Sequence, residues 1–149
     1  MAVANELKQQ LLRKIDAVES IQKCYPSEKV SPDGWPAAFL RTTDLEGSFA
    51  SSAEDSRVYG YRCTIAFPTG SDWVPEAERE RLDYAEYVLN TCLDQTIAAV
   101  DEDFELDGVP VLFVEACDAT WGYITVESGE AEAVSITLKI YTEQVVVHN

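Results

Sequence analysis

The sequence predicts an α+β fold in which a mostly antiparallel sheet is packed by two helices on one face. Two segments repeat apolar residues at helical spacing, several others alternate apolar and polar residues as strands do, and the last two strand-like segments are separated by a short turn. With 149 residues, 46% of them hydrophobic, the chain is expected to form a single domain over residues 1–149.

The first half begins with a helix. Over residues 5–21, apolar residues at spacings of four, four and three share one side of a helix, namely Leu7, Leu11, Ile15 and Val18. A loop containing prolines and a glycine precedes a short predicted strand, "AAFL", at residues 37–40. Residues 43–56 carry four acids and little periodicity, so we expect a mobile acidic loop there.

An alternating strand and a long helix follow. Between residues 57 and 70 one face of the strand collects Tyr59, Tyr61, Cys63, Ile65 and Phe67. Gly60, between two tyrosines, is expected to mark a bulge or a close approach of the backbone. Pro75 and the glutamates after it predict a helix from Pro75 to about Val100. Its predicted apolar stripe is Leu82, Ala85, Leu89, Cys92, Leu93, Thr96 and Val100.

The last third predicts three strands. Residues 109–117 form an almost continuous apolar run, which is typical of a buried strand. Residues 120–142 predict a hairpin, with strands "WGYITV" and "AVSITLKIY" on either side of an acidic turn. In the closing strand Val134, Ile136, Leu138 and Ile140 share one face.

Charge is distributed unevenly along the chain. The net charge is -16, and residues 76–149 hold 17 acidic against 3 basic residues, whereas residues 1–75 hold 10 against 8. Like-charge repulsion therefore argues against a grip on the phosphates of nucleic acid. No apolar run approaches the roughly 20 residues that a membrane helix needs, and nothing resembles a signal peptide, so we expect a soluble protein made in the cytoplasm without a membrane partner.

Residues for catalysis or metal binding are sparse. The only histidine, His148, lies beside the C-terminus, which leaves no basis for a Ser-His or Cys-His pair. The acids between Asp101 and Asp107 lack the spacing of a calcium loop and favour a solvated turn. We therefore expect no enzyme, no catalytic residue, no metal and no cofactor. The four cysteines, none in a CxxC pair, are Cys24, Cys63, Cys92 and Cys117. Three are expected to be reduced core thiols, and the sequence leaves open whether any cysteine forms a disulfide within or between chains.

The three tryptophans leave two interpretations open. Trp35, Trp73 and Trp121 either plug the ends of the domain or anchor a contact between subunits, where tryptophan and tyrosine are enriched.

The order of these elements resembles the tail terminator, or tail completion, proteins of long-tailed bacteriophages. The similarity covers roughly residues 57–143: a strand "YGYRCTIAF", a helix "EAERERLDYAEYVLNTCLDQTI", an apolar strand, the W-x-Y element from Trp121 to Tyr123, and a closing alternating strand. It is the order that carries the resemblance, because each motif alone is short.

The resemblance implies a tail-terminator-like subunit that forms a ring, commonly a hexamer, at the head-proximal end of the tail. Such a ring stops polymerisation of the tail tube and joins the tail to the neck. The implied partners are further copies of the chain, the tail tube protein, a neck or connector protein and, as a further option, the tail sheath. DNA would only pass through the lumen. The implied location is the virion, after assembly in the host cytoplasm.

Site residues follow from this interpretation. Glu46, Glu54 and Asp55 are the expected lumen-facing acids, because carboxylates repel passing phosphates. The expected subunit interface comprises Trp35, Trp73, Trp121 and Tyr123.

Two alternatives remain. One is an acidic mimic of DNA that inhibits host nucleases, which requires rows of carboxylates on one face; the other is a different head–tail connector protein. An enzyme with an unrecognised carboxylate site has the least support.

Overall fold

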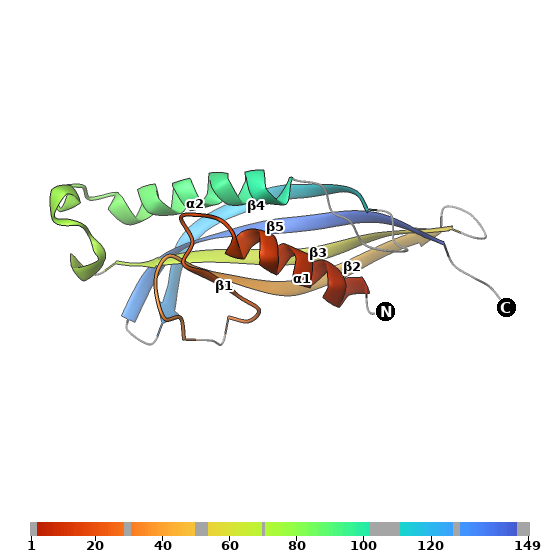
Figure 1. Ribbon diagram of the computed structural model, residues 1–149, viewed down its shortest axis with the longest axis horizontal. Helices are drawn as coiled ribbons and strands as arrows, with labels where there is room; N and C mark the ends of the chain where they lie inside the picture. The colour runs from red at the N-terminus through yellow and green to blue at the C-terminus, as the bar shows by residue number, and fades with distance from the viewer. Residues whose placement is uncertain are drawn as a thin grey trace.

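The computed structural model describes residues 3–28, 31–49, 54–69, 71–101, 111–126 and 129–145. Figure 1 shows an elongated molecule, with long strands beneath two helices. The elements in chain order are α1 (Val3–Asp16), β1 (Lys23–Tyr25), β2 (Ala37–Phe49), β3 (Glu54–Pro68), η1 (Ser71–Trp73), η2 (Glu76–Glu78), α2 (Tyr84–Val100), β4 (Val111–Val126) and β5 (Gly129–Val145).

The five strands form one mixed sheet in the order β1-β2-β3-β5-β4. Only the contact between β1 and β2 is parallel, and the other three are antiparallel. The predicted α+β class, with a mostly antiparallel sheet and two helices, is therefore confirmed. The short parallel strand β1 was not predicted, because its three residues are too few to show a period.

Both helices cover the same face of the sheet. Leu7, Leu11 and Ile15 of α1 and Leu89 and Cys92 of α2 belong to one buried cluster. The sheet contributes to this cluster the predicted alternating faces of β3 and β5, from Tyr59 to Phe67 and from Val134 to Ile140. We call this side of the sheet the helix face and the opposite side the outer face.

A buried hydroxyl fixes α1 to the sheet. The Oη atom of Tyr61 donates a hydrogen bond of 2.7 Å to the backbone oxygen of Ala4, and the Tyr61 ring is fully buried. Burial raises the pKa of Tyr61 well above that of a free tyrosine, with a smaller contribution from Tyr59. The phenol therefore stays protonated and available as a donor.

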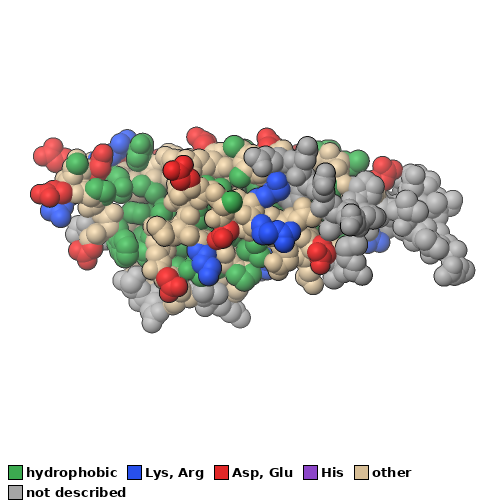
Figure 2. Space-filling model, in the orientation of Figure 1, with side chains coloured by type: hydrophobic (Ala, Val, Ile, Leu, Met, Phe, Trp, Pro, Cys, Tyr) green, Lys and Arg blue, Asp and Glu red, His purple; other side chains and the backbone are tan. Residues whose placement is uncertain are grey.

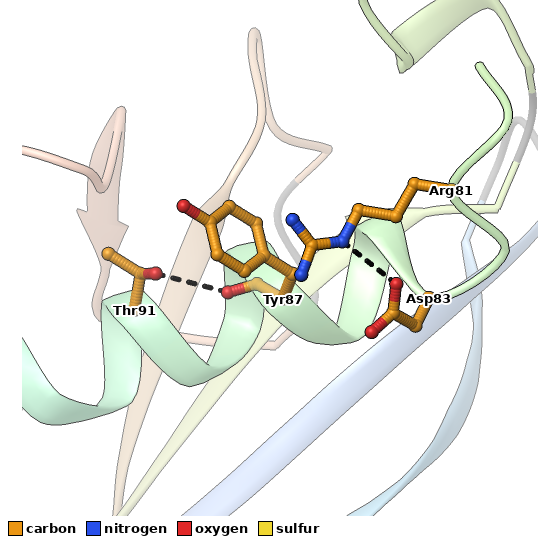
Figure 3. Close-up of polar contacts among 4 residues, drawn as sticks. All are labelled: Arg81, Asp83, Tyr87 and Thr91. Carbon is orange, nitrogen blue, oxygen red and sulfur yellow. Dashed lines mark hydrogen bonds and ion pairs between the residues drawn. The ribbon is translucent and has the colours of Figure 1, made fainter. Parts of the chain in front are cut away.

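The predicted helix start at Pro75 is wrong. Residues 76–78 form the separate 3₁₀ turn η2, α2 begins only at Tyr84, and Leu82 of the predicted stripe is fully exposed. Residues 76–83 offer few apolar side chains to bury, and a short helical segment without packing is marginal in water. Figure 3 shows what replaces it: Arg81 Nε binds Asp83 Oδ1 at 2.9 Å, and the guanidinium lies 4.0 Å from the centre of the Tyr87 ring.

Two further expectations are corrected in the sheet. The predicted loop at 43–56 is wrong for residues 43–49 and 54–56, which pair along β2 and β3, while residues 50–53 lie outside the described residues. The two predicted strands at 109–117 and 121–126 are one strand, β4, because a bulge at Asp118, with φ of 55°, carries the chain across the gap.

The close approach expected at Gly60 is confirmed. The register of β2 against β3 slips between Thr42 and Asp44, and Gly60 pairs with Asp44 at that point. A Cβ atom at Gly60 would overlap the Asp44 carboxylate and would lie 3.0 Å from Thr43 Oγ1. A side chain at this position would therefore displace Asp44.

Candidate functional site

Strand β4 is an edge strand of the sheet. On the side away from β5, its backbone has no strand partner within the described residues. This strand carries half of the large hydrophobic side chains that are exposed in the described part of the chain: Leu112, Phe113, Trp121 and Tyr123, out of eight. Exposed apolar edge strands tend to pair with other chains. We call this strand and its four exposed side chains the β4 edge.

The bulge at Asp118 divides the β4 edge into two parts. The second part, residues 120–126, contains no charged residue and no proline, although these are the usual devices that keep an edge strand from pairing. Trp121 Nε1 donates a 2.9 Å hydrogen bond to Asn90 Oδ1 of α2, which holds the indole in place while 49% of the residue stays exposed. Tyr123 is 64% exposed.

The opposite end of the sheet also leaves a backbone edge open. β1 pairs only with residues 37–39 of β2. From Leu40 onward, the side of β2 away from β3 therefore has no strand partner among the described residues. Leu45 on this stretch is 56% exposed. The sheet therefore offers one free edge at each end.

The outer face carries a row of small residues and, beside it, a pocket. In one row across four neighbouring strands, Ala37 pairs with Ala66, Ala66 with Ala133, and Ala133 with Gly122. Trp35 packs against this row, together with Ile124 and Val126 of β4. The pocket beside it has a volume of about 740 Å³, between the β1–β2 connection and the sheet. In Figure 1 the described parts of this connection lie below the sheet.

The four predicted interface residues do not form one patch. Trp35 and Trp73 line the outer-face pocket, whereas Trp121 and Tyr123 lie on the β4 edge. Trp35 is partly buried against the alanine row, which is the role of a plug, and Trp73 is 46% exposed at the pocket rim. A role for any of the four in a subunit contact stays a prediction.

The predicted lumen-facing acids lie on the hairpin of β2 and β3. Glu46 is exposed on β2, and it is the main reason that the pKa of Lys139 is raised, since its carboxylate stabilises the ammonium. Glu54 and Asp55 belong to β3, but their side chains lie outside the described residues. Glu46 thus faces a cation from β5, which the sequence did not indicate.

The cysteines are free thiols. Burial raises the pKa of Cys24 to about 12, and it raises that of Cys63 well above the usual value. Cys92 is also buried, and only Cys117, on β4, is half-buried. Within the described residues no group of three or more His, Cys, Asp or Glu side chains is placed to hold a metal ion. His148 and most of the acids from 101 to 107 lie outside the described residues.

Sequence reasoning missed the outer-face pocket. Its polar lining includes Arg62 on β3, the acids Glu28 and Asp33, and the hydroxyls of Thr64 and Ser135, whose oxygens are 3.0 Å apart. The signal that could have revealed it is the alternation of small residues in the strands, as in Thr64 and Ser135, with the large residues of the helix face.

No model of a protein family matches the chain, and no curated protein is significantly similar to it. Among the described residues, no helix has the length and apolar character to span a bilayer.

Proposed function

We propose that this protein is a structural subunit of a long-tailed bacteriophage that assembles into a ring at the head-proximal end of the tail. In this role it stops tail-tube polymerisation, joins the tail to the neck, and works by assembly without catalysis. The observation that carries the assembly part is the β4 edge, whose residues 120–126 are uncharged and have no strand partner within the described chain on the side away from β5. The order of sequence elements supplies the phage part.

The two free edges of the sheet favour a head-to-tail contact. Suppose that β4 of one copy pairs with the free edge of β2 in the next copy. Such a contact joins two different surfaces of the chain, and it closes into a ring when the rotation between successive copies divides a full turn evenly. Tyr123 and Leu45 both project on the helix face, because Tyr123 is next to Gly122 of the outer face and Leu45 pairs with Tyr59 of the helix face. A continuous sheet would therefore place apolar side chains of both copies on the same side.

The acidic surface fits a channel for DNA. Residues 72–101 hold eight carboxylates against two arginines, Arg79 and Arg81. In Figure 2 acidic side chains stand at the end of the molecule where η2 and α2 begin. A negative wall repels phosphates, so DNA would pass without adhering. The proposed partners are further copies, the tube protein and the neck, with the sheath as a further option.

Sedimentation velocity of edge variants tests the assembly. We expect the wild-type protein to sediment as a ring-sized oligomer, and Tyr123→Lys to sediment as a monomer because a lysine on an edge strand opposes pairing. Leu82→Lys is the matched control, since Leu82 is a fully exposed apolar residue away from the β4 edge. A wild-type protein that stays monomeric at about 100 μM, roughly the μM-to-mM range in which weak contacts associate, would refute the assembly.

A phage that lacks the gene tests the phage part separately. Electron microscopy should show tails of abnormal length without heads attached. Normal tails and full infectivity would leave the terminator role without support, even if the purified protein formed rings.

Mimicry of DNA is the alternative that charge favours. Asp94 on α2 and the two acids that flank this helix, Asp83 and Asp101, lie on about the same side, at spacings of about 16 Å and 10 Å along an ideal helix axis. Phosphates recur every 3.4 Å along each strand of the duplex, so these acids do not reproduce a phosphate row. A nuclease-inhibition assay that responds to removal of these acids would favour mimicry over the ring.

A further inference from the structure

The outer-face pocket has the size and composition of a small-molecule site. Its volume of about 740 Å³ falls inside the range of roughly 300–1,000 Å³ that is typical of ligand pockets. Large apolar side chains from separate parts of the chain line it, namely Trp35, Phe39, Trp73, Ile124 and Val126. Such a lining favours a flat, apolar body, because rings stack on aromatic side chains.

One cation in this pocket is available to a ligand. Arg62 lines the pocket from β3, and its side chain is exposed. Among the residues that the structure describes, no carboxylate forms an ion pair with it. Its cross-strand neighbour Arg41 differs, because Arg41 Nη1 lies 3.9 Å from Glu28 Oε2. A guanidinium presents a fork of donors that suits a carboxylate or a similar planar anion.

Other polar groups limit the charge of the ligand. Glu28 and Asp33 also line the pocket, and the whole chain carries a net charge of -16. A polyanion such as a triphosphate would be repelled by both, whereas a single negative charge can be matched by Arg62. The hydroxyls of Thr64 and Ser135, which already share one hydrogen bond, add acceptors and a donor on the floor beside Arg62.

We propose that the outer-face pocket binds a small, flat, apolar molecule that carries one anionic group, with the anion at Arg62 and the flat body against Trp35 and Trp73. This site lies on the opposite side of the sheet from Trp121 and Tyr123 of the β4 edge, and it does not depend on the proposed ring. Occupation of the pocket would link the β1–β2 connection to the sheet.

Three probes of the same shape and different charge test the proposal. Isothermal titration of the full chain would be carried out with 2-naphthylacetate, its neutral amide 2-naphthylacetamide, and the cation 2-naphthylethylamine. We expect one molecule of 2-naphthylacetate to bind per chain, at least fivefold more tightly than the amide, and the cation to bind most weakly. Equal affinities for the three, or no binding of 2-naphthylacetate up to millimolar concentration, would overturn the proposal.

Two arginine variants locate the site. Arg62→Gln should weaken 2-naphthylacetate about tenfold, as expected for loss of a charged hydrogen bond, and should leave the amide unchanged. Arg79→Gln removes the same charge from an exposed turn away from the pocket and should change neither affinity. Both arginines are exposed, so the fold should persist, and a circular dichroism spectrum checks this. Equal effects of the two substitutions would mean that only the net charge matters and would contradict the assignment to Arg62.

Discussion

Gly60 provides a sharp test of the sheet geometry. Whether Gly60→Ala lowers or raises the free energy of unfolding depends on the neighbouring Asp44 carboxylate. In Gly60→Ala the new Cβ would overlap the Asp44 carboxylate, whose Cγ lies 2.9 Å from the Cβ position. Asp44 is exposed, so its side chain can rotate away. The rotation breaks the 3.0 Å hydrogen bond from Thr43 Oγ1 to Asp44 Oδ1, which contributes about 0.5–1.5 kcal/mol. An off-rotamer side chain costs about 0.5–1.5 kcal/mol more.

An effect on the unfolded state opposes this destabilisation. Replacing glycine by alanine at a compatible backbone position stabilises by about 0.4–1 kcal/mol, because the unfolded chain loses freedom. The two losses together are about 1–3 kcal/mol, so we expect Gly60→Ala alone to lower the free energy of unfolding by up to about 2.6 kcal/mol, with a central value of about 1.3 kcal/mol. In an Asp44→Ala background the overlap with the carboxylate is gone and only the 3.0 Å approach to Thr43 Oγ1 remains, so the same substitution should stabilise by up to about 1 kcal/mol.

Urea denaturation of the four proteins in this double-mutant cycle measures the coupling directly. The expected result is a change of sign between the two backgrounds. If Gly60→Ala has the same effect with and without the Asp44 carboxylate, then Asp44 does not lie over Gly60 and the bulge in β2 is placed wrongly.

The remaining predictions concern buried hydroxyl and thiol groups. Tyr61→Phe removes the hydrogen bond to Ala4 and should lower the free energy of unfolding by about 0.5–1.5 kcal/mol in urea, and an unchanged free energy would argue against that bond. Because burial raises the pKa of Cys24 to about 12 from 9.0, the unfolded chain loses this proton first, so the contribution of this thiol to stability should be constant below pH 9 and fall as the pH rises toward 12. A rise in stability between pH 9 and 12 would contradict this reasoning. A thiol reagent should modify only Cys117 in the native protein, and Cys117→Ser should abolish this reaction. The reaction should become faster as the pH rises, because burial raises the pKa of Cys117 and only the thiolate reacts. Rapid modification of several cysteines would contradict the burial of the other three.

The features predicted correctly from sequence are those encoded within one segment. The alternation around Tyr61 assigned the buried face of β3, and the spacing of Leu7, Leu11 and Ile15 assigned that of α1. Each pattern arises because the side of a helix or strand that packs on the core must be apolar, and the regular geometry of the element spaces those residues evenly along the sequence. Gly60 was equally local, since a glycine inside a strand marks a close approach.

The features that were missed depend on partners distant in sequence. Residues 43–49 form a strand because they pair with β3 across a hairpin, although their acids and small residues show no strand period. Residues 76–83 have the composition of a helix start, but no element in the described part of the chain buries them, and the helix begins later. The outer-face pocket depends on the registers of three strands, which bring its lining residues Phe39, Thr64 and Ser135 into one row. None of these registers can be read from one segment alone.

The association of the two free edges of the sheet is the central claim, and an intermolecular disulfide tests it most directly. In a Cys117→Ser background, Tyr123→Cys on the β4 edge and Leu45→Cys on β2 would be introduced into separate chains, which are mixed and oxidised. The account predicts crosslinked dimers only in the mixture, and in a chain carrying both substitutions a ladder that ends at a closed ring. If the protein sediments as an oligomer while neither sample crosslinks through these positions, the copies associate through other surfaces and the account is contradicted.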